Sequence, residues 1–382
     1  MGSVPAQPAS PTAPSRPAWR RGWDLISWPV LRPTTTSLRW LALAAVVANV
    51  VIMSTGEAVR LSKSGLGCPD WPDCTSRSLV AASTAGQTTL NTWIEFGNRL
   101  LNFPLVAIAG LTFIAACCYR RPGIAGGGQT AGVAGGSQTA GAAGGGQTVP
   151  ARRRKDLIWL AAALPGGVIG QAVVGGIVVL TKLNPAWVAI HFMLSTAIVA
   201  AAVVLHVRVG EGDGPAVPVV RRDLKIIGAT LVGAVALTFA AGTVVTGTGP
   251  LAGNAAAPRF HLPFIGVTQF HADIGWVIAA LSFALLIGLP LSGAPRPAVR
   301  RIYTMAGLTL AQGAIGYAQY FSGLPAGLVW VHVTVAVVIW AVTVRLYLAM
   351  RERGPLPVDQ PAVAAGSLGS EDRPATAPVR GA

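Results

Sequence analysis

The chain has 382 residues, of which 52% are apolar and only 11% are charged, whereas roughly 25% of the residues in an average soluble domain are charged. Its 29 basic and 14 acidic residues give a formal charge of +15, which is typical of a nucleic-acid-binding protein or of a membrane protein with basic loops. Nearly uncharged stretches of about 20 residues, the length that crosses a bilayer core, exclude the first class and favour the second.

Residues 1–37 are rich in proline, serine, threonine and alanine, a composition that cannot bury enough apolar surface to fold. We expect a disordered tail here and a second one over residues 351–382. The N-terminal tail is not a signal peptide, because the first apolar run starts at Trp40 and is long enough to span a membrane.

Eight apolar stretches follow, so the fold class that we expect is an all-α integral membrane protein with eight transmembrane helices. The stretches cover residues 38–61, 93–118, 157–180, 187–208, 225–247, 266–291, 302–321 and 327–349. Most of the 29 basic residues lie in the tails and in the even-numbered connections, whereas the odd-numbered loops hold Lys63, Arg77, Lys182 and Arg259. Because basic loops remain cytoplasmic, we expect both termini in the cytoplasm and the protein in the plasma (inner) membrane.

A repeat within the chain predicts two halves. The motif Gln-x-x-x-Gly begins at Gln171 and again at Gln312, and it precedes His191 and His332 by the same number of residues. Extending the match backward pairs Asn98 with His271. Since each copy contains an even number of spans, the copies share one orientation, and we expect a pseudo-two-fold axis along the membrane normal.

The domain boundaries follow from this repeat. The N-terminal four-helix half covers residues 38–208 and the C-terminal four-helix half covers residues 225–350, with a cytoplasmic linker over residues 209–224. Residues 122–150, inside the first half, form a short glycine-rich tandem repeat with the composition of a flexible linker. We assign no function to this segment.

Three histidines lie at a similar depth below the outer surface: His191, His271 and His332. Histidines within a membrane span are functional candidates, because burying an imidazole in lipid is costly. His271 and His332 belong to different helices of one half and can approach one iron from opposite faces, which predicts a bis-histidine b-type haem. The alternative is that they only form hydrogen bonds between helices. We interpret His206 and His261 as structural.

His191 has no histidine partner in the N-terminal half, since the matching residue is Asn98. A single ligand suits a transient substrate porphyrin better than a permanent electron carrier. Glu95 lies on the helical face of Asn98, and its counterpart in the second half is Thr268, so this carboxylate is specific to the half with the incomplete ligand set. The alternative reading of Glu95 is an interfacial residue paired with Arg99.

Cys68 and Cys74 lie in the first outer loop, where an oxidising environment allows a disulfide. Zinc would need further cysteine or histidine ligands, and this loop contains none. Cys117 and Cys118 lie at the cytoplasmic end of the second span, and we expect them to be reduced.

These motifs resemble those of the haem A synthase family. The resemblance rests on the three histidines and on three segments, Thr55-Gly56-x-x-Val59-Arg60-Leu61, Ser64-Gly-Leu-Gly-Cys-Pro-Asp-Trp-Pro-Asp-Cys74 and Glu95-x-x-x-Arg99. It implies an oxidoreductase that converts haem O to haem A, oxidising a ring methyl to a formyl group with oxygen from water. It also implies haem O synthase as a partner and an electron acceptor that the sequence does not identify.

The resemblance also implies roles for individual residues. His271 and His332 take the places of the haem b ligands, and His191 that of a ligand to the substrate haem. Glu95 takes the place of the family's functional glutamate, and the two outer-loop cysteines take the places of a pair that can form a disulfide. The chain departs from the family pattern at Asn98, where many members have histidine, and in its third outer loop, which lacks a second cysteine pair.

Arg60 and Arg99 lie near the outer interface and could pair with haem propionates. Two other classes of protein remain open: a bis-histidine cytochrome that only transfers electrons, and a transporter built on the same duplication. The cytochrome leaves Glu95 without a role, and the transporter would bind no haem.

Overall fold

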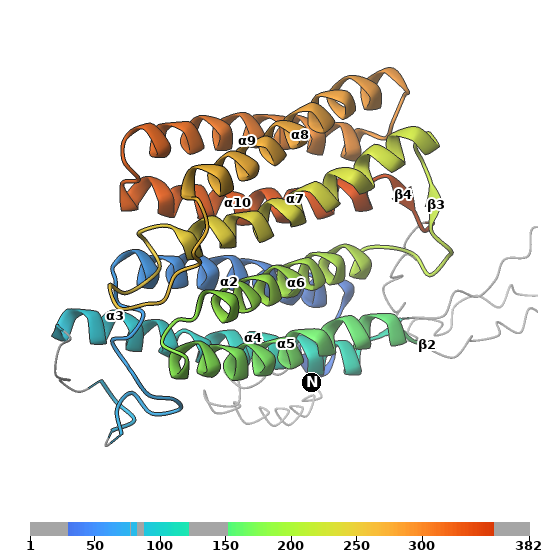
Figure 1. Cartoon of the computed structure of the whole chain (residues 1–382). Coiled ribbons are helices and arrows are strands. Elements are labelled where there is room, and N and C mark those ends of the chain that lie inside the picture. Colours follow the sequence, from blue (N-terminus) through green and yellow to red (C-terminus); the bar gives the residue numbers. More distant parts are fainter. Residues whose placement is uncertain (1–29, 77, 82–87, 122–151, 355–382) are drawn as a thin grey trace, which may run out of the picture.

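The computed structural model describes residues 30–76, 78–81, 88–121 and 152–354. The glycine-rich segment 122–150 and most of both expected tails lie outside these ranges. Long helices dominate the described part of the chain (Figure 1). They are α2 (Thr35–Leu61), α3 (Thr89–Leu100), α4 (Asn102–Cys118), α5 (Lys155–Leu180), α6 (Pro185–Val209), α7 (Arg222–Thr248), α8 (Phe264–Leu291), α9 (Arg296–Phe321) and α10 (Ala326–Leu348).

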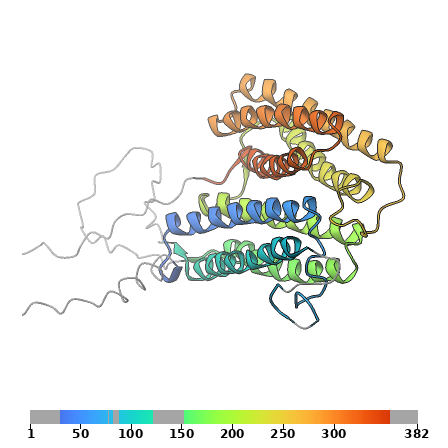
Figure 2. The same cartoon turned by 90° about the vertical axis from the view of Figure 1, so that its left-hand side faces the viewer.

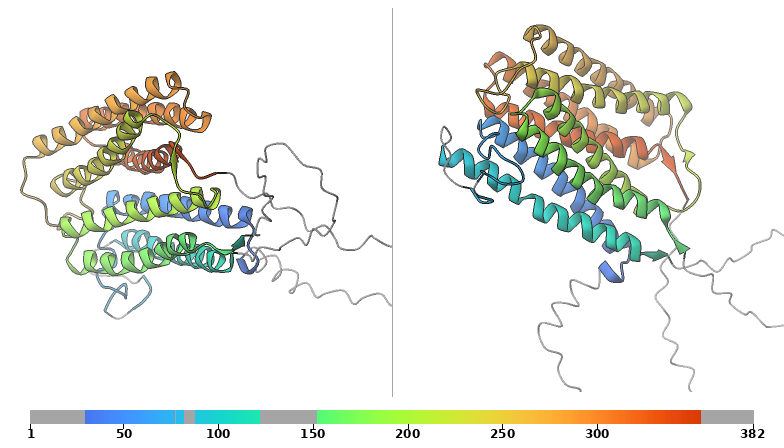
Figure 3. Two further views of the ribbon diagram at one scale, coloured as in Figure 1. Left: turned by 90° about the vertical axis from the view of Figure 1, so that its right-hand side faces the viewer. Right: turned by 60° about the horizontal axis from the view of Figure 1, so that its bottom comes forward.

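The helices form two groups that lie one above the other (Figures 1 and 2). In the first group α2 packs on α4 and α6, and α5 packs on α4 and α6. The second group repeats this closed arrangement, with α7 on α8 and α10, and α9 on α8 and α10. The groups meet where α2, α6, α7 and α10 come together, and Figure 3 shows the same division from two other sides.

Each group has its own apolar core. One cluster of buried side chains joins α2, α4, α5 and α6, and includes Leu38, Leu157 and Leu205. The other lies mainly among α7, α8, α9 and α10, and it also takes in Met53 of α2 and Val199 of α6. The second core therefore extends into the contact between the two groups.

Seven helical segments of the described chain are long and apolar enough to cross a membrane, with α3 and α4 together counting as one. They coincide with seven of the eight expected spans. The remaining helix, α9, has 26 residues and is long enough, but Gln312, Gln319 and three tyrosines make it more polar than the others. One of these polar residues, Gln312, forms a hydrogen bond with the backbone of α10.

The second expected span is interrupted at Leu101, between α3 and α4. Pro104 explains the break, because its ring carries no N–H to donate to the carbonyl of Leu100 and crowds that carbonyl. Glu95, Asn98 and Arg99 thus belong to α3, which has its own N-terminal cap at Thr88.

The edges of the expected tails are ordered, which corrects the boundaries predicted from composition. Val30 is buried, and Thr34 caps α2 through a reciprocal pair of hydrogen bonds with Ser37. At the other end, β4 (Arg351–Glu352) pairs antiparallel with β3 (Val217–Pro218) of the expected linker. A similar short pair, β1 (Arg120–Arg121) and β2 (Arg152–Arg153), stands at the base of the glycine-rich segment.

Candidate functional site

The imidazoles of His271 on α8 and His332 on α10 face each other inside the second group of helices. Their ring centres are 6.3 Å apart and the ring planes make an angle of 59°. Imidazoles are common nitrogen ligands of iron in proteins. This pair is placed to bind one metal atom from two sides.

A glycine on the neighbouring helix gives each ring its space. A Cβ at Gly242 of α7 would lie 3.2 Å from Cε1 of His271, and a Cβ at Gly316 of α9 would lie 3.3 Å from Cε1 of His332. In both cases the next nearest ring atom is Nδ1. In each ring the edge that carries Nδ1 therefore packs against the glycine of the neighbouring helix. The other ring nitrogen, Nε2, points away from that glycine.

The Nδ1 atoms of both rings are buried and form no hydrogen bond with the described residues. The carbonyl of Thr238, one turn before Gly242, lies near the His271 ring without reaching hydrogen-bond geometry. Such a carbonyl could hold the proton on Nδ1 and leave Nε2 free to bind a metal. On α10 the backbone is anchored instead, because Gln312 Nε2 donates to the carbonyl of His332 at 3.0 Å.

The first group of helices repeats these contacts around His191 on α6. A Cβ at Gly175 of α5 would lie 3.2 Å from Cε1 of His191, and Gln171 Nε2 donates to the His191 carbonyl at 3.0 Å. The His191 Nδ1 atom is likewise buried without a hydrogen bond to the described residues. In both halves the repeated motif therefore makes the same two contacts with a histidine: its glutamine bonds to the histidine carbonyl, and its glycine packs against the imidazole.

Asn98 on α3 holds the place that His271 holds in the second group. A Cβ at Gly56 of α2 would lie 3.9 Å from Asn98 Nδ2, as one at Gly242 would approach His271. The Oδ1 atom of Asn98 is buried and has no hydrogen-bond partner among the described residues. The two sites thus share a framework and differ in one potential ligand, an amide in place of an imidazole.

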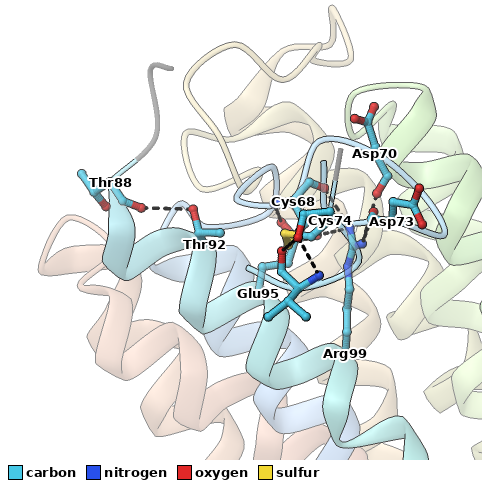
Figure 4. Close-up of a disulfide and its surroundings, with 10 residues drawn as sticks. Cys68, Asp70, Asp73, Cys74, Thr88, Thr92, Glu95 and Arg99 are labelled. Atoms are coloured by element: carbon cyan, nitrogen blue, oxygen red, sulfur yellow. Dashed lines mark hydrogen bonds and ion pairs between the residues drawn. A yellow bond between two sulfur atoms is a disulfide. The ribbon is translucent and has the colours of Figure 1, made fainter. Parts of the chain in front are cut away.

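Glu95, one turn before Asn98, is buried beneath the loop between α2 and α3 (Figure 4). Its Oε1 atom accepts from Arg99 at 2.7 Å and its Oε2 atom accepts from the backbone N–H of Cys68 at 2.8 Å. The pairing with Arg99 considered from the sequence is present. The side chain of Glu95 is only 8% exposed, however, so the pair is not a solvated surface contact.

Arg99 extends this hold on the loop. Its guanidinium donates to the carbonyls of Cys68, Asp70 and Asp73 at 2.8, 3.1 and 3.0 Å, and Cys68 and Cys74 form a disulfide. The predicted bridge is therefore confirmed. Arg99 and Glu95 together fix the ends and the middle of the disulfide loop to α3, as Figure 4 shows.

The same loop reaches the helix that supports His191. A Cβ at Gly176 of α5 would fall 2.6 Å from the ring of Trp71, so the indole lies directly on the α5 backbone next to Gly175. Gly67 approaches the backbone of α3 equally closely, since its Cβ would lie 2.5 Å from the carbonyl oxygen of Asn91. The disulfide loop therefore covers this end of the first site.

Arg60 is engaged elsewhere. Its guanidinium pairs with Glu57 and donates to the carbonyl of Leu251 in the loop between α7 and α8. The N–H of Gly65 also donates to the carbonyl of Gly253 in that loop, at 3.2 Å. These contacts tie the loop between α2 and α3 to the loop between α7 and α8 and join the two groups of helices at this end.

The remaining candidates lie apart from both sites. His206 bonds through Nδ1 to the backbone carbonyl of Arg39, at 3.1 Å, and His261 is exposed in the loop between α7 and α8. Cys117 and Cys118 are free and half-buried. Gly175 and Gly316 belong to the repeated Gln-x-x-x-Gly motif of the sequence, whereas the contacts of Gly56 with Asn98 and of Gly242 with His271 were not predicted. The Gly-x-x-Val pattern that these two glycines share would have revealed them.

Comparisons with known proteins agree with this arrangement. The chain is 25% identical over 387 aligned positions to a protein of Bradyrhizobium sp. (strain ORS 278) named "Heme A synthase", with 89% of this chain and 99% of the relative covered. A protein of the same name from Bradyrhizobium sp. (strain BTAi1 / ATCC BAA-1182) is 24% identical, with 88% and 99% covered. A third, from Lysinibacillus sphaericus (strain C3-41), is 33% identical over 63 positions, which cover 16% of this chain and 19% of the relative.

A family model described as "Cytochrome oxidase assembly protein" (COX15-CtaA) matches residues 38–344. The match includes Asn98, the three histidines His191, His271 and His332, the disulfide loop, the helices from α3 to α9 and most of α2 and α10. With its apolar helices, the chain is a multi-pass membrane protein, and it belongs to the COX15-CtaA family of cytochrome oxidase assembly proteins.

Proposed function

We propose that this protein is a haem A synthase, which oxidises a ring methyl of haem O to a formyl group with oxygen taken from water. One observation carries the proposal: two sites of the same construction differ at one ligand position, and a buried carboxylate stands beside only one of them. Two identical sites would suit two identical electron carriers. Unlike sites suit a resident haem and a substrate haem, and the names of the relatives support this assignment.

The second group of helices fits a resident haem b. An imidazole nitrogen binds a first-row metal at about 2.0–2.1 Å, so two imidazoles on opposite sides of one iron have ring centres about 6 Å apart. The 6.3 Å between His271 and His332 matches this requirement. The described residues contain no cluster of three or more His, Cys, Asp or Glu side chains that could hold a metal ion, so a porphyrin would supply the other iron ligands.

When bound there, haem b supplies a redox centre that can take up the electrons removed from the substrate. His271 and His332 would hold it through their imidazole nitrogens. Gly242 and Gly316 leave room for the two rings, and Gln312 holds the α10 backbone at His332. We infer that these residues fix the orientation of the ligands before the haem arrives.

The first group of helices would receive haem O. His191 would hold its iron, and Asn98, which offers an amide in place of a second imidazole, would bind it weakly or not at all, which favours release of the product. Glu95 is the proton acceptor for the attacking water or for the methyl group, since a buried carboxylate can act as a general base. Its bonds to Arg99 and Cys68 hold it at the mouth of the site.

We assign Arg60 and Arg99 to positioning the outer loops rather than to haem propionates, because their guanidinium groups already bind carboxylates and carbonyls of the protein. Any contact with a propionate would have to share these groups.

The membrane arrangement completes the proposal. α9 crosses the bilayer with the seven apolar helices, giving eight spans in two halves related by a pseudo-two-fold axis along the membrane normal. The matching helix order of the two groups supports this symmetry. The basic connections support a location in the plasma membrane with both termini in the cytoplasm. A haem O synthase supplies the substrate, and an external acceptor removes the electrons.

The proposal is tested in cells that make haem O but no haem A of their own. Expression of this protein should lead to haem A in the extracted haems, identified by mass. A cytochrome that only transfers electrons is the second candidate, and the pair His271 and His332 favours it on its own. That candidate predicts bound haem b with unchanged haem O and no haem A.

A further inference from the structure

An apolar groove lies where the two groups of helices meet, and the proposed chemistry does not involve it. The groove has a volume of about 280 Å³ and runs between α2 and α10, with α6 at its base. Its walls include Val47 and Val51 on one side and Val338 on the other, and these side chains are 53%, 48% and 36% exposed. The groove is therefore open to the surroundings of the bundle, which in a membrane protein are the lipids.

One end of the groove is cationic. Arg345 and His206 line it there, and the guanidinium groups of Arg39 and Arg301 lie close enough to Arg345 to repel it electrostatically. The Nε atom of Arg345 is buried without a hydrogen-bond partner. Among the described residues, no acidic side chain forms an ion pair with any of these three arginines.

Other arginines at the same end of the molecule are neutralised. Arg154 pairs with Asp156 and Asp213 at 2.7 and 3.0 Å, and Arg208 pairs with Asp156 and Glu211. Within the described ranges, the cluster Arg39, Arg301 and Arg345 therefore lacks the acidic partners that Arg154 and Arg208 have. A positive cluster at the end of an apolar groove is complementary to a molecule that has an anionic headgroup and an apolar chain.

We propose that this groove binds an anionic glycerophospholipid, with its phosphate at Arg39, Arg301 and Arg345 and one acyl chain between α2 and α10. The distance from Arg345 to Val338 is seven residues along α10, about 10 Å of helix, so the chain would enter the apolar core directly below the phosphate. Trp40, which is 66% exposed beside Arg39, is typical of the headgroup level. Basic pockets between helices on the cytoplasmic side commonly bind such headgroups.

The lipid would join the two halves, because α2 belongs to one and α9 and α10 to the other. This role is independent of haem chemistry and goes beyond the proposed function. It concerns the end of the molecule remote from the disulfide loop, where the outer loops tie the halves together through Arg60.

The full-length protein, purified in a mild detergent after incubation with equal amounts of phosphatidylglycerol and phosphatidylcholine, tests the proposal. Bound lipids are extracted and quantified by mass. The wild type should retain phosphatidylglycerol in excess, and Arg345→Gln should lower the ratio of the two lipids about fivefold. Arg300→Gln removes a neighbouring exposed arginine outside the cluster and should leave the ratio unchanged.

A second variant separates a lipid site from a site for free phosphate. Val47→Trp fills the groove without altering a charge, so it should reduce the retention of both lipids, whereas binding of a free anion would not respond. Equal retention of the two lipids by the wild type would overturn the proposal. So would an equal loss in Arg300→Gln and Arg345→Gln, or full retention of phosphatidylglycerol in Val47→Trp.

Discussion

Gly316 on α9 lies so close to His332 on α10 that a Cβ there would stand 3.3 Å from the imidazole. Gly175 stands in the same relation to His191, at 3.2 Å. In each half a glycine on one helix thus sets the position of a histidine on the next. These two glycines therefore differ from glycines with open space around them, because a side chain at either position would displace a histidine.

Substituting this glycine should disturb haem binding without changing a ligand. Gly316→Ala places a methyl group closer to His332 than nine in ten real contacts of this kind, so the ring must shift. We expect a lower haem b content and a weakened low-spin spectrum. Gly313→Ala, on the same helix with open space around its Cβ, should bind haem b normally, and equal haem loss in both variants would contradict the role of Gly316.

Glu95→Gln tests the proposed proton acceptor. The amide can still accept the N–H of Cys68, so the loop should stay in place and haem b should be retained, but the substituted side chain cannot take up a proton. Haem O or a partly oxidised product should accumulate. Glu57→Gln is the matched control, because Glu57 is also buried and ion-paired at this end of the molecule. Near-normal haem A from Glu95→Gln, at equal haem b content, would remove Glu95 from the mechanism.

Loss of the disulfide should loosen the loop over the first site. The bridged cysteines are six residues apart, and closing so short a loop stabilises a protein by about 2 kcal/mol. Cys68→Ser should therefore lower the melting temperature and reduce haem A formation more than haem b content. Cys117→Ser alters a free cysteine and should do neither. An unchanged melting temperature in Cys68→Ser would show that Glu95 and Arg99 hold the loop unaided.

The ion-pair network at the opposite end should matter for stability alone. Asp156 accepts from Arg154 and Arg208, whose side chains are 4% and 8% exposed. Asp156→Asn leaves both guanidinium groups with less counter-charge, and we expect a loss of about 1–3 kcal/mol, measured as a lower melting temperature. Asp223→Asn breaks an exposed pair with Arg221 and should leave the melting temperature unchanged. Equal effects of the two substitutions would contradict this account.

Much of this organisation could be predicted from the sequence. The helices follow the apolar stretches closely, because a bilayer-crossing helix needs about 20 apolar residues whatever its neighbours. The motif Gln-x-x-x-Gly correctly indicated equivalent surroundings for His191 and His332, since a repeated spacing on helices reproduces repeated contacts. The pairing of Cys68 with Cys74 was also predicted correctly.

Other features depend on contacts between distant segments. Composition alone did not indicate that residues 30–37 and 351–352 are ordered, because a cap and a short strand pair stabilise them. The hold of Arg99 on the disulfide loop depends on the carbonyls of three loop residues, which no local pattern encodes. The cluster of Arg39, Arg301 and Arg345 is assembled from three helices and is visible only in the folded chain.

The central claim is that the two halves hold haem differently, and the haem spectrum and extracted haems of two histidine variants test it most directly. His332→Ala should lose the low-spin bis-histidine signal, because it removes one of the two imidazoles that we propose to hold haem b. His191→Ala should keep that signal but yield no haem A in cells that supply haem O. Loss of the low-spin signal in His191→Ala, with its retention in His332→Ala, would contradict the assignment of the resident haem to the second group of helices.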